Sequence, residues 1–255
     1  MSYQWVRFSG SAGVGFGQLL RGNIQVFDGD MFQQPVATGA TIALSSVELL
    51  TPVTPGKVIA MWNNFHALAE KLNLPTPPEP LYLLKAPNSF LKPGGTILNP
   101  PCGGKVVFEG ELGIVIGRRA RQVTPADALD HVFGYTCAND VTVADILHRD
   151  ASFPQWVRAK GFDTFCPFGP VVATGIDPAQ LVVKTWLNGE LRQDYPINDM
   201  RFSVEQLVSL ISQDMTLEPG DLILCGTSVG VGSMKPGSLV EVEITGIGKL
   251  SNRFE

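Results

Sequence analysis

Short apolar runs separated by turn residues dominate the chain. Apolar and polar residues alternate over residues 3–8, and further apolar runs occupy residues 24–27, 57–61, 81–85 and 106–117. Runs of this length, bounded by glycine, proline and asparagine, predict strands. A hairpin is also expected where Asn188-Gly189 joins two strand-like segments, because this pair favours a type I′ turn. The pattern therefore predicts many short strands.

Helical periodicity is confined to a few segments. Residues 66–72 favour a short helix, and Thr124-Pro125 with Asp127 predicts the first turn of another. Ser203-Val204-Glu205-Gln206 reads as a capping box, followed by apolar residues at helical spacing. The proline-rich stretch 75–80 predicts an extended loop. The fold class expected from these elements is a mixed β-rich α+β fold with short helices.

Residues 51–56, Thr-Pro-Val-Thr-Pro-Gly, suggest a boundary in this fold. We expect a small N-terminal β-rich domain over residues 1–55 and a main domain over residues 56–255. No internal repeat is visible.

Composition narrows the class of protein. The 255 residues are 44% hydrophobic and carry a net charge of −5, which excludes a nucleic-acid binder that relies on basic charge. No apolar stretch has the length of a membrane span and no signal peptide is visible, so we expect a cytoplasmic protein with no membrane partner. Four separated cysteines argue against a zinc site or disulfides, and only three histidines favour oxygen ligands for any metal.

Two carboxylates lie two residues apart in the apolar run at 106–117. On a single strand, Glu109 and Glu111 would share one face, where a divalent cation such as Mg²⁺ or Mn²⁺ would relieve their repulsion. The alternative is a solvated face of a half-exposed sheet. A third acid, Asp140, ends another apolar strand and opens an expected helix through residues 141–146. It is either a further ligand or a simple helix N-cap.

Three other segments carry candidate chemistry. Residues 158–170 predict a loop that presents Lys160, which would support negative charge, form a Schiff base if its pKa were depressed, or simply pair with Asp163. Residues 226–232 lack the end of a phosphate loop, but the hydroxyl group of Thr227 suits a substrate carboxylate. His66, at the start of a short helix, is the foremost candidate for proton transfer.

These segments together resemble the fumarylacetoacetate hydrolase family. The Glu-x-Glu strand, Gly-Tyr-Thr-x-Ala-Asn-Asp-Val, Arg-x-Lys-Gly-x-Asp-x-Phe-x-Pro-x-Gly-Pro and Gly-Thr-x-x-Gly-Val-Gly match in order over residues 57–255. The resemblance implies a mixed β-roll fold, a homodimer, and Mg²⁺ or Mn²⁺ in each subunit. It also implies a role for five matched residues: Glu109, Glu111 and Asp140 as metal ligands, Lys160 as the active-site lysine, and Thr227 near the substrate carboxylate. Asp163 and Lys85 are further candidates for substrate binding.

The first helix departs from the family pattern. Many members carry Asn-Tyr-x-x-His-x-x-Glu there, and this chain has Leu68 and Lys71 at the positions of that histidine and glutamate. His66 and Glu70 lie four residues apart and would share one helical face, so they are candidates for a substitute catalytic pair. The alternative is that they are unrelated to catalysis.

The function expected from residues and resemblance is that of a Mg²⁺- or Mn²⁺-dependent enzyme. It would act on a small 2-oxo acid or dioate by decarboxylation or isomerisation through a metal-bound enolate. One alternative is hydrolysis of a C–C bond in an acylpyruvate such as fumarylacetoacetate, which needs an activated water. The other is a catalytically silent metal-binding or structural β protein.

Overall fold

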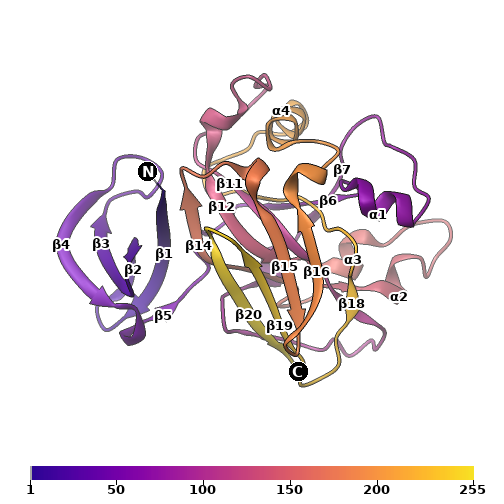
Figure 1. Cartoon of the computed structure of the whole chain (residues 1–255), viewed down its shortest axis with the longest axis horizontal. Helices are drawn as coiled ribbons and strands as arrows, with labels where there is room; N and C mark the ends of the chain where they lie inside the picture. Colours follow the sequence, from indigo (N-terminus) through magenta and orange to yellow (C-terminus); the bar gives the residue numbers. More distant parts are fainter. Residues whose placement is uncertain (1) are drawn as a thin grey trace.

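Strands dominate the computed structural model, which describes residues 2–255 (Figure 1). The largest sheet has twelve strands. Ten of them follow one another in the order β4 (Val36–Ala43), β3 (Asn23–Asp28), β2 (Gly13–Leu20), β1 (Tyr3–Gly10), β14 (Cys166–Thr174), β12 (Val132–Asn139), β11 (Gly110–Ile116), β17 (Leu222–Leu224), β6 (Val58–Trp62) and β7 (Leu81–Lys85). Two short strands complete it, β5 (Glu48–Leu49) beside β1 and β8 (Phe90–Leu91) beside β14.

Two smaller sheets complete the fold, and the five-stranded one packs against the large sheet. The five-stranded sheet has the order β16 (Glu190–Pro196), β15 (Val182–Leu187), β19 (Leu239–Ile244), β20 (Gly248–Phe254) and β9 (Thr96–Ile97). The three-stranded sheet has the order β13 (Thr142–Val143), β10 (Val106–Phe108) and β18 (Gly232–Ser233). The helices are α1 (His66–Lys71), α2 (Ala144–Leu147), α3 (Trp156–Lys160) and α4 (Val204–Asp214). None of the helices within residues 2–255 is long and apolar enough to span a membrane.

The N-terminal strands β1 to β4 form a separate lobe in Figure 1, yet they belong to the large sheet. Strand β1 pairs antiparallel with β14, and Trp5 lies opposite Val172. The lobe is therefore joined to the rest of the chain by backbone hydrogen bonds. Whether residues 1–55 form an independent domain stays a prediction.

Strand β11 is buried on both faces, as its continuous apolar sequence predicts. Leu112, Ile114 and Ile116 enter the core between the large and the five-stranded sheets. Val115 enters a second core on the opposite face of the large sheet. Burial of this strand therefore fixes its own residue Glu111 deep inside the molecule.

The structure confirms two local predictions, the hairpin and the capping box. The hairpin turns at Asn188 and Gly189, both with positive φ. Ser203 and Gln206 form the capping box of α4. Cys137 and Cys225 are buried free thiols.

Two helix predictions were wrong. After Thr124-Pro125 the chain forms a turn and a short 3₁₀ helix at Ala128–His131, because too few residues separate this proline from the next strand. Asp140 opens no helix, because residues 142–143 first add strand β13 to the small sheet and α2 begins only at Ala144. Asp140 is therefore not an N-cap.

Candidate metal and active site

Three carboxylates meet beside β11. One oxygen from each of Glu109, Glu111 and Asp140 lies within 4.8 Å of the others. Glu111 and Asp140 are fully buried, whereas the side chain of Glu109 keeps 14% of its surface exposed. The cluster therefore opens to solvent on the side of Glu109, and its alternative interpretation as a solvated strand face is wrong.

Glu109 does not lie within the same strand as Glu111. It occupies the break between β10 and β11, where the chain passes from the small sheet to the large one. The backbone N–H of Glu109 donates to Asn139 Oδ1 at 2.9 Å, and the N–H of Asp140 donates to the Glu109 carbonyl at 2.9 Å. These two bonds bring the end of β12 to the break, and they place the third carboxylate beside the first two.

Two buried lysines bind the carboxylates. The Lys160 ammonium donates to Glu109 Oε2 at 2.7 Å, to Asp140 Oδ2 at 2.6 Å and to the Thr142 hydroxyl at 2.8 Å. Lys85 Nζ donates to the other oxygen of Asp140, Oδ1, at 2.5 Å. Both oxygens of Asp140 are thus held by ammonium groups.

The segment around Lys160 differs from the expected loop. Lys160 is the last residue of helix α3, and the chain enters strand β14 six residues later. Asp163 does not pair with this lysine, because it is exposed and accepts a hydrogen bond from Asn88 Nδ2 at 2.6 Å. The expected surface pair is therefore wrong.

The charges in the cluster shift one another's pKa values. Burial raises the pKa of Glu111 well above its usual value and also raises that of Glu109, and repulsion from Asp140 adds to both. Burial alone would also raise the pKa of Asp140, but the ammonium groups of Lys160 and Lys85 outweigh it and hold this pKa below its usual value. Burial disfavours the charged form of Lys160, yet the carboxylates dominate and raise its pKa. A Schiff-base role, which needs a neutral amine, is therefore disfavoured.

The donor set fits a hard divalent cation. Three carboxylates with no histidine or cysteine among them suit Mg²⁺ or Mn²⁺. Glu111 Oε2 accepts from the N–H of Gly226 at 2.8 Å, but the buried Oε1 atom of Glu111 has no hydrogen-bond partner among the described residues. A buried carboxylate oxygen without a partner is costly, and a cation would satisfy it.

A glutamine absent from the sequence predictions connects the acidic strand to the loop after β17. Gln193 accepts from the N–H of Gly110 at 3.0 Å and donates to the Thr227 hydroxyl at 2.8 Å and to the Ser228 carbonyl at 3.2 Å. The Thr227 hydroxyl in turn donates to the Gly110 carbonyl at 3.0 Å. Thr227 is therefore bound to Gly110, the residue between the two glutamates, and it lies beside the cluster.

Other predicted site residues lie apart from the carboxylates. His66 and Glu70 are exposed on α1, and across residues 2–255 no hydrogen bond or ion pair joins either of them to the acidic cluster. Lys85 is fully buried and bound to Asp140, so it positions a carboxylate. Asp163 faces solvent. The structure thus brings together the predicted ligands, Lys160 and Thr227, but not the predicted catalytic pair.

Comparison with known proteins identifies the family. Residues 57–255 match the family described as "Fumarylacetoacetate (FAA) hydrolase C-terminal", and residues 4–52 match "Rv2993c-like, N-terminal". The chain therefore belongs to the fumarylacetoacetate hydrolase family. This confirms the family resemblance and the β-roll fold class expected from the sequence.

Relatives show the range of chemistry in this family. The mitochondrial oxaloacetate tautomerase FAHD2B of Bos taurus is 38% identical over 82% of this chain and 70% of its own. A 2-hydroxyhepta-2,4-diene-1,7-dioate isomerase from Mycobacterium marinum is 37% identical, with a TM-score of 0.91 over 99% of this chain and 98% of its own. A maleylpyruvate hydrolase from Sphingobium sp. SYK-6, solved with manganese(II) and pyruvate, is 29% identical, with a TM-score of 0.80 over 98% of each chain.

Proposed function

We propose that this enzyme binds Mg²⁺ or Mn²⁺ and converts a small 2-oxo acid by enolate-forming chemistry, either isomerisation (tautomerisation included) or decarboxylation. The observation that carries the proposal is the buried cluster of three carboxylates with one ammonium group, that of Lys160, bound between two of them. The relatedness to an isomerase and to an oxaloacetate tautomerase supports the same class of reaction.

Each residue of the cluster has a role in this proposal. Glu109, Glu111 and Asp140 hold the cation, which when bound supplies a Lewis acid that polarises the 2-oxo group. Lys160 remains protonated and stabilises negative charge that develops on the substrate oxygen. Thr227 orients the substrate carboxylate, and its hydroxyl proton turns from the Gly110 carbonyl to that carboxylate when the substrate binds.

Hydrolysis of an acylpyruvate is the second candidate, and the relatedness to a maleylpyruvate hydrolase favours it. Hydrolysis requires a base that activates water, and the α1 positions of the family's His-Glu pair hold Leu68 and Lys71 here. Enolate formation needs no such water, so we rank it first. The homodimer, the cytoplasmic location and the roles of His66 and Glu70 stay predictions.

A substrate panel tests the proposal. Purified protein is incubated with oxaloacetate, an unsaturated 2-oxo-dioate and an acylpyruvate, with Mg²⁺, with Mn²⁺ or with EDTA. We expect metal-dependent conversion of a 2-oxo acid, inhibition by oxalate, and a higher rate on oxaloacetate or the dioate than on the acylpyruvate. Efficient cleavage of the acylpyruvate alone would establish hydrolysis, and no metal-dependent turnover would indicate a silent protein.

Metal binding is tested separately from turnover. Mg²⁺ or Mn²⁺ should raise the unfolding temperature and EDTA should lower it, because the ion binds only the folded site. Glu111→Gln should abolish this response, since it removes the charge of a ligand that has one free oxygen. A wild-type protein that shows no calorimetric signal with millimolar metal would contradict the assignment of the site.

A further inference from the structure

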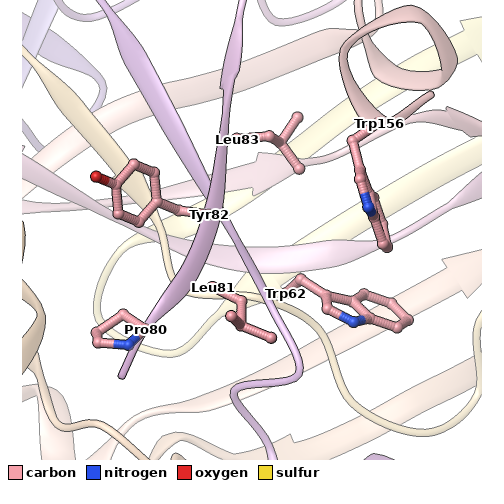
Figure 2. Close-up of a pocket in the computed structure, with 6 residues that line it drawn as sticks. All are labelled: Trp62, Pro80, Leu81, Tyr82, Leu83 and Trp156. Carbon is pink, nitrogen blue, oxygen red and sulfur yellow. The ribbon is translucent and has the colours of Figure 1, made fainter. Parts of the chain in front are cut away.

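An aromatic cavity of about 350 Å³ lies at the ends of β6 and β7. Its lining residues are Trp62, Pro80, Leu81, Tyr82, Leu83 and Trp156, shown in Figure 2. The two tryptophan rings lie 4.7 Å apart between centroids, at an angle of 49°. Both side chains are only partly buried, and the volume is that of a small-ligand pocket.

Strand register relates this cavity to the carboxylates. Gly113 of β11 pairs with Leu224 of β17, which pairs in turn with Ala60 of β6. Glu111 and Trp62 are each two residues further toward the same end of the sheet, so their side chains leave the same face. Only β17 separates their strands, which places the two backbones about 10 Å apart.

Helix α3 has one end at the aromatic cavity and the other at the carboxylate cluster. Trp156 starts the helix and lines the cavity, whereas Lys160 ends it and binds Glu109 and Asp140. Residues four apart lie on one side of a helix. Helix α3 therefore places the cavity at one of its ends and the carboxylate cluster at the other, on the same side of the helix.

The lining of the cavity defines what can occupy it. None of its six residues carries a charge, so no side chain there pairs with a second carboxylate. Tyr82 supplies the only phenolic hydroxyl group, but this group donates to Asp214 Oδ2 at 2.9 Å and points away from the tryptophans (Figure 2). What remains is two indole rings and aliphatic groups, which suit a flat apolar group.

We infer that this cavity is a subsite for the tail of the substrate, and that the tail is uncharged and apolar, such as an aryl or alkenyl group. This inference rests on the proposed function, because the 2-oxo-carboxylate end of the same molecule would be held at the carboxylate cluster. Trp62 and Trp156 are the residues that determine specificity for the tail. The protein then binds monocarboxylic 2-oxo acids with apolar tails more tightly than 2-oxo-dioates of similar length.

A matched ligand pair tests the subsite. 2-Oxo-4-phenylbutanoate and 2-oxoglutarate share the 2-oxo-carboxylate and the two-carbon spacer, and they differ only in a terminal phenyl or carboxylate group. With Mn²⁺ present, calorimetry should show that the phenyl compound binds about 10- to 100-fold more tightly, as expected for burial of one aromatic ring. Trp62→Ala should remove this difference and leave the affinity for pyruvate and oxalate within about twofold.

Controls separate the possible failures. Trp186→Ala changes a partly exposed tryptophan on β15 and should leave every affinity unchanged. The subsite is refuted if 2-oxoglutarate binds as tightly as the phenyl compound, or if Trp62→Ala weakens all ligands equally. A fall in oligomer mass in Trp62→Ala would also refute it, because a second copy of the chain would then cover the rings. If neither oxalate nor pyruvate binds with Mn²⁺, the proposed function fails and the subsite fails with it.

Discussion

The position of the Lys160 ammonium has a consequence for metal affinity. It binds one oxygen each of Glu109 and Asp140, two of the three residues that would hold the cation. A positive charge a few ångströms from a cation opposes its binding. We therefore expect Lys160→Met to bind Mn²⁺ about tenfold more tightly while turnover is lost. Calorimetry with Mn²⁺ measures this directly, and weaker binding in the variant would show that Lys160 supports the ion site.

Protonation of the glutamates predicts the pH dependence of metal binding. Burial raises the pKa of Glu111 and Glu109, so each carboxyl holds its proton to a higher pH in the folded protein than in the unfolded chain. Without metal, these two groups stabilise the fold at low pH, and this stabilisation is lost as pH rises through the raised pKa values. A cation needs the deprotonated forms, so its stabilising effect should grow over the same range.

Proton release checks this prediction. Mn²⁺ binding should liberate protons near and below the raised pKa values, seen as a heat that varies with the ionisation enthalpy of the buffer. Titrations of the wild-type protein at one pH in two buffers of different ionisation enthalpy give the number of protons released. A metal-induced shift in unfolding temperature that is constant with pH would contradict the assigned burial effect.

At the scale of elements, Gln193 connects β16 to β11 and to the loop after β17. Its three hydrogen bonds fix Gly110, Thr227 and Ser228 relative to one another. Gln193→Leu should lower the free energy of unfolding by about 2–3 kcal/mol, because it leaves buried polar groups unpaired. It should also weaken substrate binding, since Thr227 loses a partner.

Thr185 on the neighbouring strand provides a matched control. Its buried hydroxyl has no hydrogen-bond partner among residues 2–255, although it lies close to Gly110. Thr185→Val keeps the shape and removes the unpaired group, so it should be neutral or stabilising by up to about 1 kcal/mol. Urea unfolding compares the two variants, and equal losses would show that packing, and not hydrogen bonding, maintains this region.

Helix α1 gives a prediction about proton transfer. His66 and Glu70 are exposed, and Ala69 is the only buried residue of the helix. We expect His66→Ala to retain turnover within about threefold, whereas Lys160→Met should lose about 10²- to 10³-fold, the usual contribution of one group that stabilises developing negative charge. Steady-state rates with saturating Mn²⁺ decide this, and a loss of that larger size in His66→Ala would assign proton transfer to the histidine.

The sequence predicted which carboxylates would lie together better than it predicted the elements that carry them. Glu109, Glu111 and Asp140 are recognisable because few charged residues interrupt their apolar segments, whereas the role of Lys160 came from the family resemblance. The break at Glu109 was not predictable, because the same apolar pattern suits one long strand or two strands in different sheets. Gln193 was not predicted as a site residue because, in its strand, the polar residue is buried and the apolar one is not. Leu191 is 47% exposed, while Gln193 is 1% exposed. Inward-facing Tyr195, two residues on, was the available signal, since i and i+2 share a face.

At the scale of the whole molecule, the N-terminal lobe and the site are parts of one sheet. Strand β14 pairs with β1 on one side and with β12 on the other, and β12 leads directly to Asp140. Trp5 of β1 packs against Phe133 of β12 with 6.1 Å between ring centroids. The proline- and glycine-containing segment 51–56 suggested a domain boundary. The pairing of β1 with β14 could not be predicted, because strand pairing between distant segments leaves no local pattern in the sequence.

This connection predicts the effect of truncation. A chain that begins at residue 51 would leave one edge of β14 unpaired and would expose Phe133, which also loses its contact with Phe32 at 5.1 Å. An apolar surface beside an open strand edge promotes association between chains. We therefore expect the truncated protein to unfold at least about 5 °C below the full chain, since one kcal/mol already shifts a large domain by about 2–4 °C, and to scatter light on heating. Mn²⁺ should still bind below that temperature, because the truncation removes no carboxylate or lysine of the cluster. Equal unfolding temperatures would show instead that the lobe and the main part of the chain fold independently.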